Sequence, residues 1–154
     1  MTEKRKRVRA IIFKQDSILS MYRERDGRTF YTFPGGGMEG CETEEDCVER
    51  ECFEEFGIVV KPVKKVYIYE TERSIEYFYI CKWISGNIGD GTGEEFQPDN
   101  NNGVYRPTSI KISKIPSLPL MPSEVAALLL EDYSKNGEYL RNDIKSTIAK
   151  QNSN

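Results

Sequence analysis

Residues 36–58 read GGMEGCETEEDCVERECFEEFGI, and this segment carries the strongest structural signal in the chain. Glu51, Glu54 and Glu55 are spaced i, i+3 and i+4, so an α-helix would place their carboxylates on one face, ~5–6 Å apart at Cβ. Residues 42–55 hold eight acidic side chains and a single basic one. Like charges this close destabilise a helix, and a divalent cation neutralises them far better than screening by salt does.

The chain contains no histidine, which removes the commonest protein ligand for zinc and copper. Carboxylate oxygens select hard cations such as Mg²⁺, Mn²⁺ and Ca²⁺. Mg²⁺ usually binds through one or two carboxylates together with waters and substrate phosphates. The competing interpretation is a solvated, Glu-rich surface helix without a ligand, which the charge alone would favour.

The flanks of the segment favour a ligand site over a plain surface helix. Three successive glycines, residues 35–37, follow an aromatic-rich strand and permit positive φ and close approach of the backbone to a ligand. Thr43 suits the N-cap of a helix over residues 43–56, and Gly57 suits the position just after its end. The buried stripe predicted for this helix consists of Val48, Cys52 and Phe56.

The glycines, the glutamate spacing and the arginine together reproduce the Nudix box, and the chain resembles the Nudix hydrolase family. The fixed positions of the box are filled by Gly36, Glu42, Arg50, Glu51, Glu54, Glu55 and Gly57, and its apolar positions by Cys52 and Ile58. The resemblance implies an α/β (α+β) fold, an α/β/α sandwich with a mixed β-sheet. It also implies divalent-metal-dependent hydrolysis of a nucleoside diphosphate linked to a further group X, with Mg²⁺ or Mn²⁺ as cofactor.

The resemblance also implies roles for individual residues. The metal-binding set is the Gly36 carbonyl with Glu51, Glu54 and Glu55. Glu42, Arg50 and Gly57 take supporting positions, and Arg50 is expected either to orient a glutamate or to form a simple surface ion pair. The general base stays open between Glu51 and a later glutamate, for which the candidates are Glu94 and Glu95. The alternative for the last two is an ordinary pair of loop carboxylates.

Substrate contacts are expected close to the glycines and at the end of the second strand. The candidates are Arg23, Arg25, Tyr31, Phe33, Gly35, Gly36 and Gly37. An aromatic ring can stack on a base, which contributes ~1–3 kcal/mol per base in nucleic-acid systems. Aromatic residues on strands more often pack in the core, and this remains the alternative for Tyr31 and Phe33.

Several substrates fit the box, because specificity in this family comes from loops outside it. The short chain favours a nucleoside triphosphate, including an oxidised one such as 8-oxo-dGTP, acted on by a pyrophosphohydrolase. ADP-ribose or another nucleotide sugar is the alternative. A Nudix-like module that senses a nucleotide without hydrolysing it, and an enzyme acting on RNA 5′ ends, are further alternatives. The expected partner is a small nucleotide, and the protein is expected to be a monomer or homodimer.

Length, charge and cysteine content narrow the class of protein further. The 154 residues are expected to form one domain, 1–154, with flexible ends at residues 1–7 and 151–154. The net charge of −3 argues against a general nucleic-acid partner. Residues 4–9 contain five basic side chains, which could contact phosphate; the alternative is that this segment is a solvated tail before the first strand. No signal peptide or membrane span is apparent, and four cysteines without a Cys-x-x-Cys motif suit a reduced, cytoplasmic protein.

Periodicity and turn residues predict the remaining elements. Strands are expected over residues 8–13, 18–22, 29–33, 58–70, 75–84 and 104–112, with a bulge near Pro62 and an interruption at Pro107. Residues 85–103 read as a substrate loop and residues 115–122 as a linker-like turn. A strong helix is expected over residues 122–133 with Ser123 as a possible cap, and a weaker helix over residues 139–150.

Overall fold

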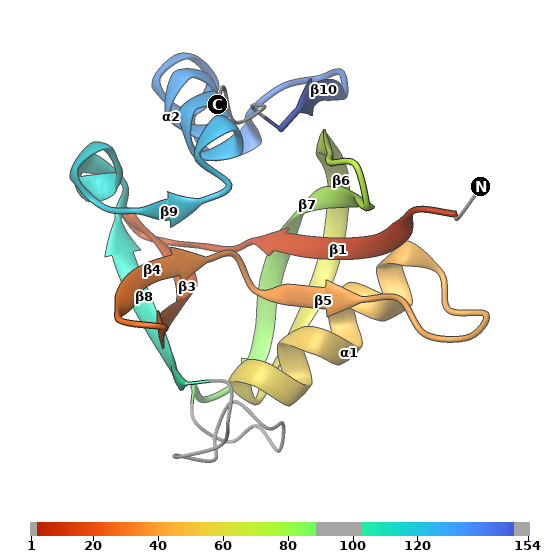
Figure 1. Ribbon diagram of the computed structural model, residues 1–154. Coiled ribbons are helices and arrows are strands. Elements are labelled where there is room, and N and C mark those ends of the chain that lie inside the picture. Colours follow the sequence, from red (N-terminus) through yellow and green to blue (C-terminus); the bar gives the residue numbers. More distant parts are fainter. Residues whose placement is uncertain (1–2, 89–102, 150–154) are drawn as a thin grey trace.

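The computed structural model describes residues 3–88 and 103–149 of the chain (Figure 1). Its elements in chain order are β1 (Arg5–Ile11), β2 (Phe13–Lys14), β3 (Ser17–Arg25), β4 (Arg28–Thr32), β5 (Gly35–Gly37), α1 (Glu44–Phe56), β6 (Ile58–Glu70), β7 (Ser74–Gly86), β8 (Val104–Lys111), the 3-10 helix η2 (Ile112–Ser117), β9 (Leu120–Met121), α2 (Ser123–Asn136), the 3-10 helix η3 (Gly137–Tyr139) and β10 (Lys145–Ile148).

The strands form two mixed sheets. The first has the order β10-β6-β7-β1-β5, and the second has the order β2-β3-β4-β9 with β8 also paired to β3. Three pairs are parallel, namely β1 with β7, β10 with β6 and β4 with β9, and the other pairs are antiparallel. The expected α+β class with mixed pairing is therefore confirmed, with two sheets where a single sheet was expected.

Two buried clusters lie on opposite faces of the first sheet. Val8 and Ala10 of β1 pack with α1 in one cluster, whereas Ile11 packs with α2 in the other. This follows from the alternation of side chains along a strand. α1 and α2 accordingly lie on opposite sides of β1 and β7 (Figure 1), which is the helix–sheet–helix layering expected from the sequence.

α1 has the boundaries and caps that the sequence predicts. The Thr43 hydroxyl accepts a hydrogen bond from the Asp46 N–H at 3.0 Å, and Gly57 ends the helix at φ 72° with its N–H bonded to the Phe53 carbonyl. The predicted stripe of Val48, Cys52 and Phe56 is fully buried. The caps and the apolar stripe thus fix both the length of the helix and its rotation about its axis.

Several strands also match their prediction. β6 has the predicted boundaries, and its register with β7 shifts between Pro62 and Lys64, where the bulge was expected. The expected break at Pro107 was wrong, because β8 continues through it and pairs with Met21. β1 begins at Arg5, so residues 5–7, assigned above to a flexible end, pair with β5 and β7 instead.

The C-terminal prediction was wrong in form. Residues 139–150 contain no long helix in the described part; β10 instead pairs in parallel with the outer side of β6. Hydrogen bonds to the free backbone groups of the β6 edge stabilise this segment more than its weak helix propensity would. Asp132 of α2 supports this end, since it accepts hydrogen bonds from the Tyr67 hydroxyl at 2.7 Å and from Arg141 at 3.1 Å.

The segment before α2 also differs from its prediction. Residues 115–122 are not a plain turn, because they contain the end of η2 and the strand β9, which pairs with β4. The N-cap of α2 is Pro122 and no side chain caps the helix. Ser123 directs its hydroxyl to the Glu124 carboxylate at 3.2 Å, so its expected capping role was wrong.

The two candidate caps provide a matched test. We expect Thr43→Ala to lower the free energy of unfolding by about 1 kcal/mol, since it removes the acceptor for an otherwise unpaired helix N–H. Ser123→Ala should change it by less than about 0.5 kcal/mol, as for a surface substitution. Urea unfolding of the two variants measures both values, and an equal loss in both would contradict the capping assignment.

Candidate active site

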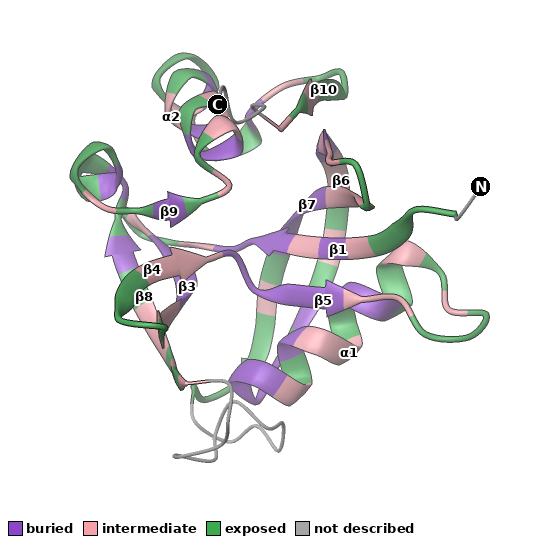
Figure 2. Cartoon of the chain, in the orientation of Figure 1, coloured by how far each residue is buried: buried purple, intermediate pink, exposed green. Residues whose placement is uncertain are grey.

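The glycine strand β5 lies at the edge of the first sheet and is buried except at Gly37 (Figure 2). Gly35 has φ 139°, and a Cβ added to it would stand 2.0 Å from the Val8 carbonyl oxygen. A Cβ on Gly36 would stand 2.5 Å from the Glu51 carboxylate. Glycine is therefore required at both positions, first by β1 and then by a box glutamate that reaches the backbone of β5.

Glu55 joins α1 to the same strand. Its side chain is buried, and its Oε1 accepts a hydrogen bond from the Gly35 N–H at 2.7 Å. A buried carboxylate needs such donors, because its desolvation is otherwise costly. Glu51 and Glu55 thus approach successive residues of β5. Glu54, the third glutamate of the predicted face, is 41% exposed and contacts Arg50.

Arg50 ties the acidic side chains together. It donates to both carboxylate oxygens of Glu42 at 2.6 and 3.1 Å, to Glu51 at 3.2 Å, to Glu54 at 3.1 Å and to the Gly37 carbonyl at 3.0 Å. The hydrogen bonds with Glu42 raise the pKa of Arg50 and lower the pKa of Glu42. Arg50 is only 22% exposed, so it is a brace and not an isolated surface ion pair.

The donor set fits a hard cation. The Gly36 carbonyl and the carboxylates of Glu51, Glu54 and Glu55 offer only oxygen ligands, as Mg²⁺ prefers. The neighbouring Cys47 is buried, which raises the pKa of its thiol to about 12, and the thiol donates to the Gly36 carbonyl at 3.7 Å. Within residues 3–88 and 103–149, however, no three Asp, Glu, Cys or His side chains already form a metal cluster. Arg50 engages Glu51 and Glu54, so metal binding through them requires that their contacts with Arg50 rearrange.

The predicted substrate residues divide into two groups. Gly35, Gly36 and Gly37 lie at the site as β5. Phe33 does not, because its side chain is 1% exposed and packs edge-to-face on Phe78 in the core. The base-stacking role considered for Phe33 is therefore corrected to core packing, which was the alternative.

The aromatic and arginine candidates of the second sheet are also partly engaged. Arg23 is held between the rings of Phe30 and Tyr105, at 5.3 and 4.2 Å from their centroids, and its buried Nε has no hydrogen-bond partner among the described residues. Tyr31 stacks edge-on against Tyr22 beside the core. Arg25 is half exposed and pairs weakly with its neighbour Asp26 at 3.9 Å. Among these candidates, Arg23 is the one that packs on an aromatic ring, Phe30, that lines a cleft.

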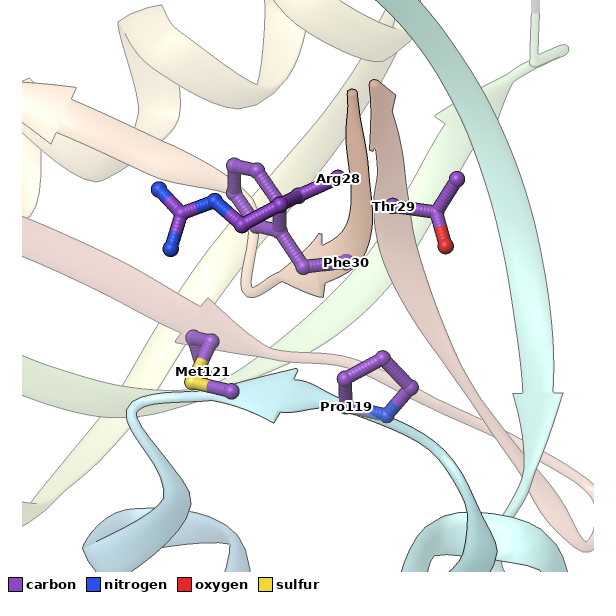
Figure 3. A pocket seen from close by; sticks show the side chains of 5 residues that line it. All are labelled: Arg28, Thr29, Phe30, Pro119 and Met121. Carbon is purple, nitrogen blue, oxygen red and sulfur yellow. The ribbon is translucent and has the colours of Figure 1, made fainter. Parts of the chain in front are cut away.

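Two adjoining clefts run beside β4 and β9. Arg28, Thr29, Phe30, Pro119 and Met121 line the first, of about 460 Å³ (Figure 3). The second, of about 250 Å³, shares Met121 and is lined further by Arg9, Thr32, Tyr69, Glu76, Pro122, Ser123 and Glu124. Sequence reasoning missed Met121, and it included Arg9 only as one of the five basic side chains of residues 4–9.

The other catalytic candidates, Glu94 and Glu95, lie outside the described residues. Gly57 ends α1 and Glu42 pairs with Arg50, and the supporting role of both residues in catalysis stays a prediction. No helix in residues 3–88 and 103–149 has the length and apolar character needed to cross a bilayer.

Comparison with known proteins identifies the family of the chain. The NUDIX domain family matches residues 3–104, and the chain therefore belongs to that family. No curated protein matches the chain.

Three solved structures illustrate the similarity of fold. An ADP-ribose pyrophosphatase from Streptococcus suis is 22% identical, with a TM-score of 0.64 over 95% of this chain and 99% of that one. A NUDIX hydrolase from Nitrosomonas europaea is 14% identical, with a TM-score of 0.72 over 96% and 81%. A MutT protein from Bacillus halodurans is 22% identical, with a TM-score of 0.60 over 82% of each chain.

The brace makes stability depend on pH. The pKa of Glu42 is lowered by Arg50, so the carboxylate contributes stability above its ordinary value near 4.5, and this contribution disappears as the pH falls below that value. We expect Glu42→Gln to lower the free energy of unfolding by about 1–2 kcal/mol at pH 7, and by much less at pH 3. Urea unfolding at both pH values measures the difference.

Glu39 is the matched control for Glu42. It is 73% exposed and lies 3.8 Å from Arg50, so Glu39→Gln should change stability by less than about 0.5 kcal/mol at either pH. A pH-independent loss in Glu42→Gln would show that the carboxylate acts through packing alone.

Proposed function

We propose that this protein hydrolyses the diphosphate bond of a nucleotide with Mg²⁺ or Mn²⁺, and that its substrate is a nucleoside triphosphate, in normal or oxidised form. The observation that carries this proposal is the convergence of Glu51 and Glu55 on the side-chain-free strand β5. Buried thiols at Cys47, Cys52 and Cys81, all free, suit the reduced cytoplasm in which we place the enzyme.

In the proposed reaction, the oxygen of a water molecule bonds to a phosphorus atom and the bridging P–O bond breaks. A triphosphate would give a nucleoside monophosphate and pyrophosphate, with one proton passed through a carboxylate to the solvent. Mg²⁺ or Mn²⁺, when bound, supplies positive charge to the phosphoryl oxygens and lowers the pKa of water. The absence of side chains on β5 allows the phosphate group to approach the backbone closely.

Glu51 is our candidate for the general base. Its side chain is 14% exposed and adjoins Gly36, so it can reach both water and substrate. Glu55 is more buried and one of its oxygens is engaged by Gly35, which suits a fixed ligand better. Arg50 would hold Glu51 and Glu54 in place before the cation binds.

The paired clefts supply a place for the nucleoside. Phe30 of β4 and Met121 of β9 both line the first cleft (Figure 3), so a base could be bound between them. Similarity to an ADP-ribose pyrophosphatase makes a nucleotide sugar the second candidate substrate. A module that binds nucleotide without turnover is the third, and the intact set of box glutamates disfavours it.

The catalytic assignment is tested by Glu55→Gln. The amide keeps the size of the side chain and an oxygen for the Gly35 N–H, so we expect an unchanged fold and a kcat at least about 100-fold lower. Phosphate and pyrophosphate release from a nucleotide panel with Mg²⁺ or Mn²⁺ measures this. Glu49→Gln, on the exposed face of the same helix, should keep full activity. Equal turnover by Glu55→Gln and the wild type would remove Glu55 from the site.

The base cleft is tested by Phe30→Ala. Loss of a stacked ring should raise KM about 10-fold and leave kcat within a factor of about 3. Tyr139→Ala is the control, because this aromatic side chain is 83% exposed and lines neither cleft. Steady-state kinetics on the preferred nucleotide, with thermal unfolding as a check on folding, distinguishes the two variants. An unchanged KM in Phe30→Ala would place the base elsewhere.

A further inference from the structure

The basic N-terminal run is an ordered row of side chains. Because successive side chains of a strand point to opposite faces, Arg5, Arg7 and Arg9 share one face of β1, whereas Lys6 and Val8 share the other. Val8 is fully buried against α1, which establishes that the arginines lie on the face away from α1. Three guanidinium groups therefore follow one another directly beside β5.

Arg9 has a structural role in this row. Its Nε donates to Glu76 at 2.9 Å, and its Nη1 donates to the carbonyls of Phe33 and Gly35 at 3.2 and 3.1 Å. Arg9 also lines the second cleft. Its charge is neutralised and its position is fixed, so Arg9 marks the end of the row nearest to the clefts.

Arg5 and Arg7 are not neutralised in this way. Neither donates a side-chain hydrogen bond to another residue within 3–88 and 103–149. Arg5 lies over Gly37, with its Nη2 2.9 Å from the position of a Cβ on that glycine. Arg7 is half-buried, and its pKa is lowered by burial and by repulsion from Arg9 and Arg5, against the attraction of Glu76 and Glu51. The two groups thus form a positive site that an anion would relieve.

We propose that Arg5 and Arg7 bind the terminal phosphate of a nucleoside triphosphate whose base lies in the clefts and whose inner phosphates lie along β5. This inference rests on the proposed function and specifies the substrate class. A guanidinium group can donate two parallel hydrogen bonds to two oxygens of one phosphate. The row of arginines runs from the clefts, at Arg9, toward Gly37, so a nucleotide with its base in the clefts would extend its terminal phosphate toward Arg7 and Arg5. The terminal sugar of ADP-ribose carries no charge, so it would leave both guanidinium charges without a counter-charge.

The first experiment needs no turnover. Inorganic triphosphate and pyrophosphate are titrated by calorimetry, with Mg²⁺ present, into the wild type, Arg5→Gln, Arg7→Gln and Lys6→Gln. The wild type should bind triphosphate about 10- to 100-fold more tightly than pyrophosphate, as expected for charge-assisted hydrogen bonds. Arg5→Gln and Arg7→Gln should each lose most of this preference. Lys6→Gln removes the same charge from the opposite face and should retain it.

The second experiment measures turnover of ATP and ADP-ribose, which share adenosine diphosphate and differ in the terminal group. Arg7→Gln should lower kcat/KM for ATP about 10- to 100-fold and leave the value for ADP-ribose within a factor of about 3. Arg5→Gln is the second test of the same site. Arg5 is exposed, so we expect this variant to fold even if Arg7→Gln is unstable.

Failure of the two ideas can be told apart. Absence of hydrolysis of every nucleotide would overturn the proposed function, while the calorimetry would still decide the role of the arginines. Equal binding of triphosphate and pyrophosphate by the wild type, or equal losses in Lys6→Gln and Arg7→Gln, would overturn the terminal-phosphate site. Preference for 5′-triphosphorylated RNA over free triphosphate would overturn its assignment to a small nucleotide.

Discussion

The close contact between α1 and the glycine strand β5 is the constraint on which the rest of the site depends. A Cβ on Gly35 would strike β1 and disturb the pairing of β5 with β1, whereas a Cβ on Gly36 would strike Glu51 and push α1 away from β5. The Gly35 N–H reaches Glu55 only at this separation. Backbone geometry, the buried carboxylate and the placement of a second glutamate are therefore parts of a single packing arrangement.

This arrangement concentrates negative charge, and Arg50 is the means by which the protein tolerates it. The guanidinium spans Glu42, Glu51, Glu54 and the Gly37 carbonyl, so the loop before α1 and the acidic face of α1 are held by one cation. Since Arg50 stays charged at all accessible pH values, the brace itself does not titrate, and only its carboxylate partners respond to acid. The acidic face is thereby ordered in advance of any metal or substrate.

Positive charge is arranged on the opposite side of the same edge. The β1 arginines lie beside β5 because that strand has no side chains to cover them, and Glu51 lies close enough to influence Arg7. Acidic and basic groups thus flank the glycine strand from two directions. An elongated polyanion with bound cations is complementary to such a surface, because the cations pair with the acidic groups and the polyanion pairs with the arginines. A neutral ligand would leave the charges of the arginines unpaired.

The sequence by itself determined the features that depend on neighbours within a few residues. The cap at Thr43, the stripe of Val48, Cys52 and Phe56, the turn at Gly57 and the alignment of three glutamates follow from helical periodicity and local hydrogen bonding. Only the tertiary structure decided that Phe33 is core, that residues 145–148 form an edge strand, and that Arg5 and Arg7 face β5. Each of these outcomes depends on pairing between distant segments, whose backbone groups and apolar faces outweigh weak local preferences.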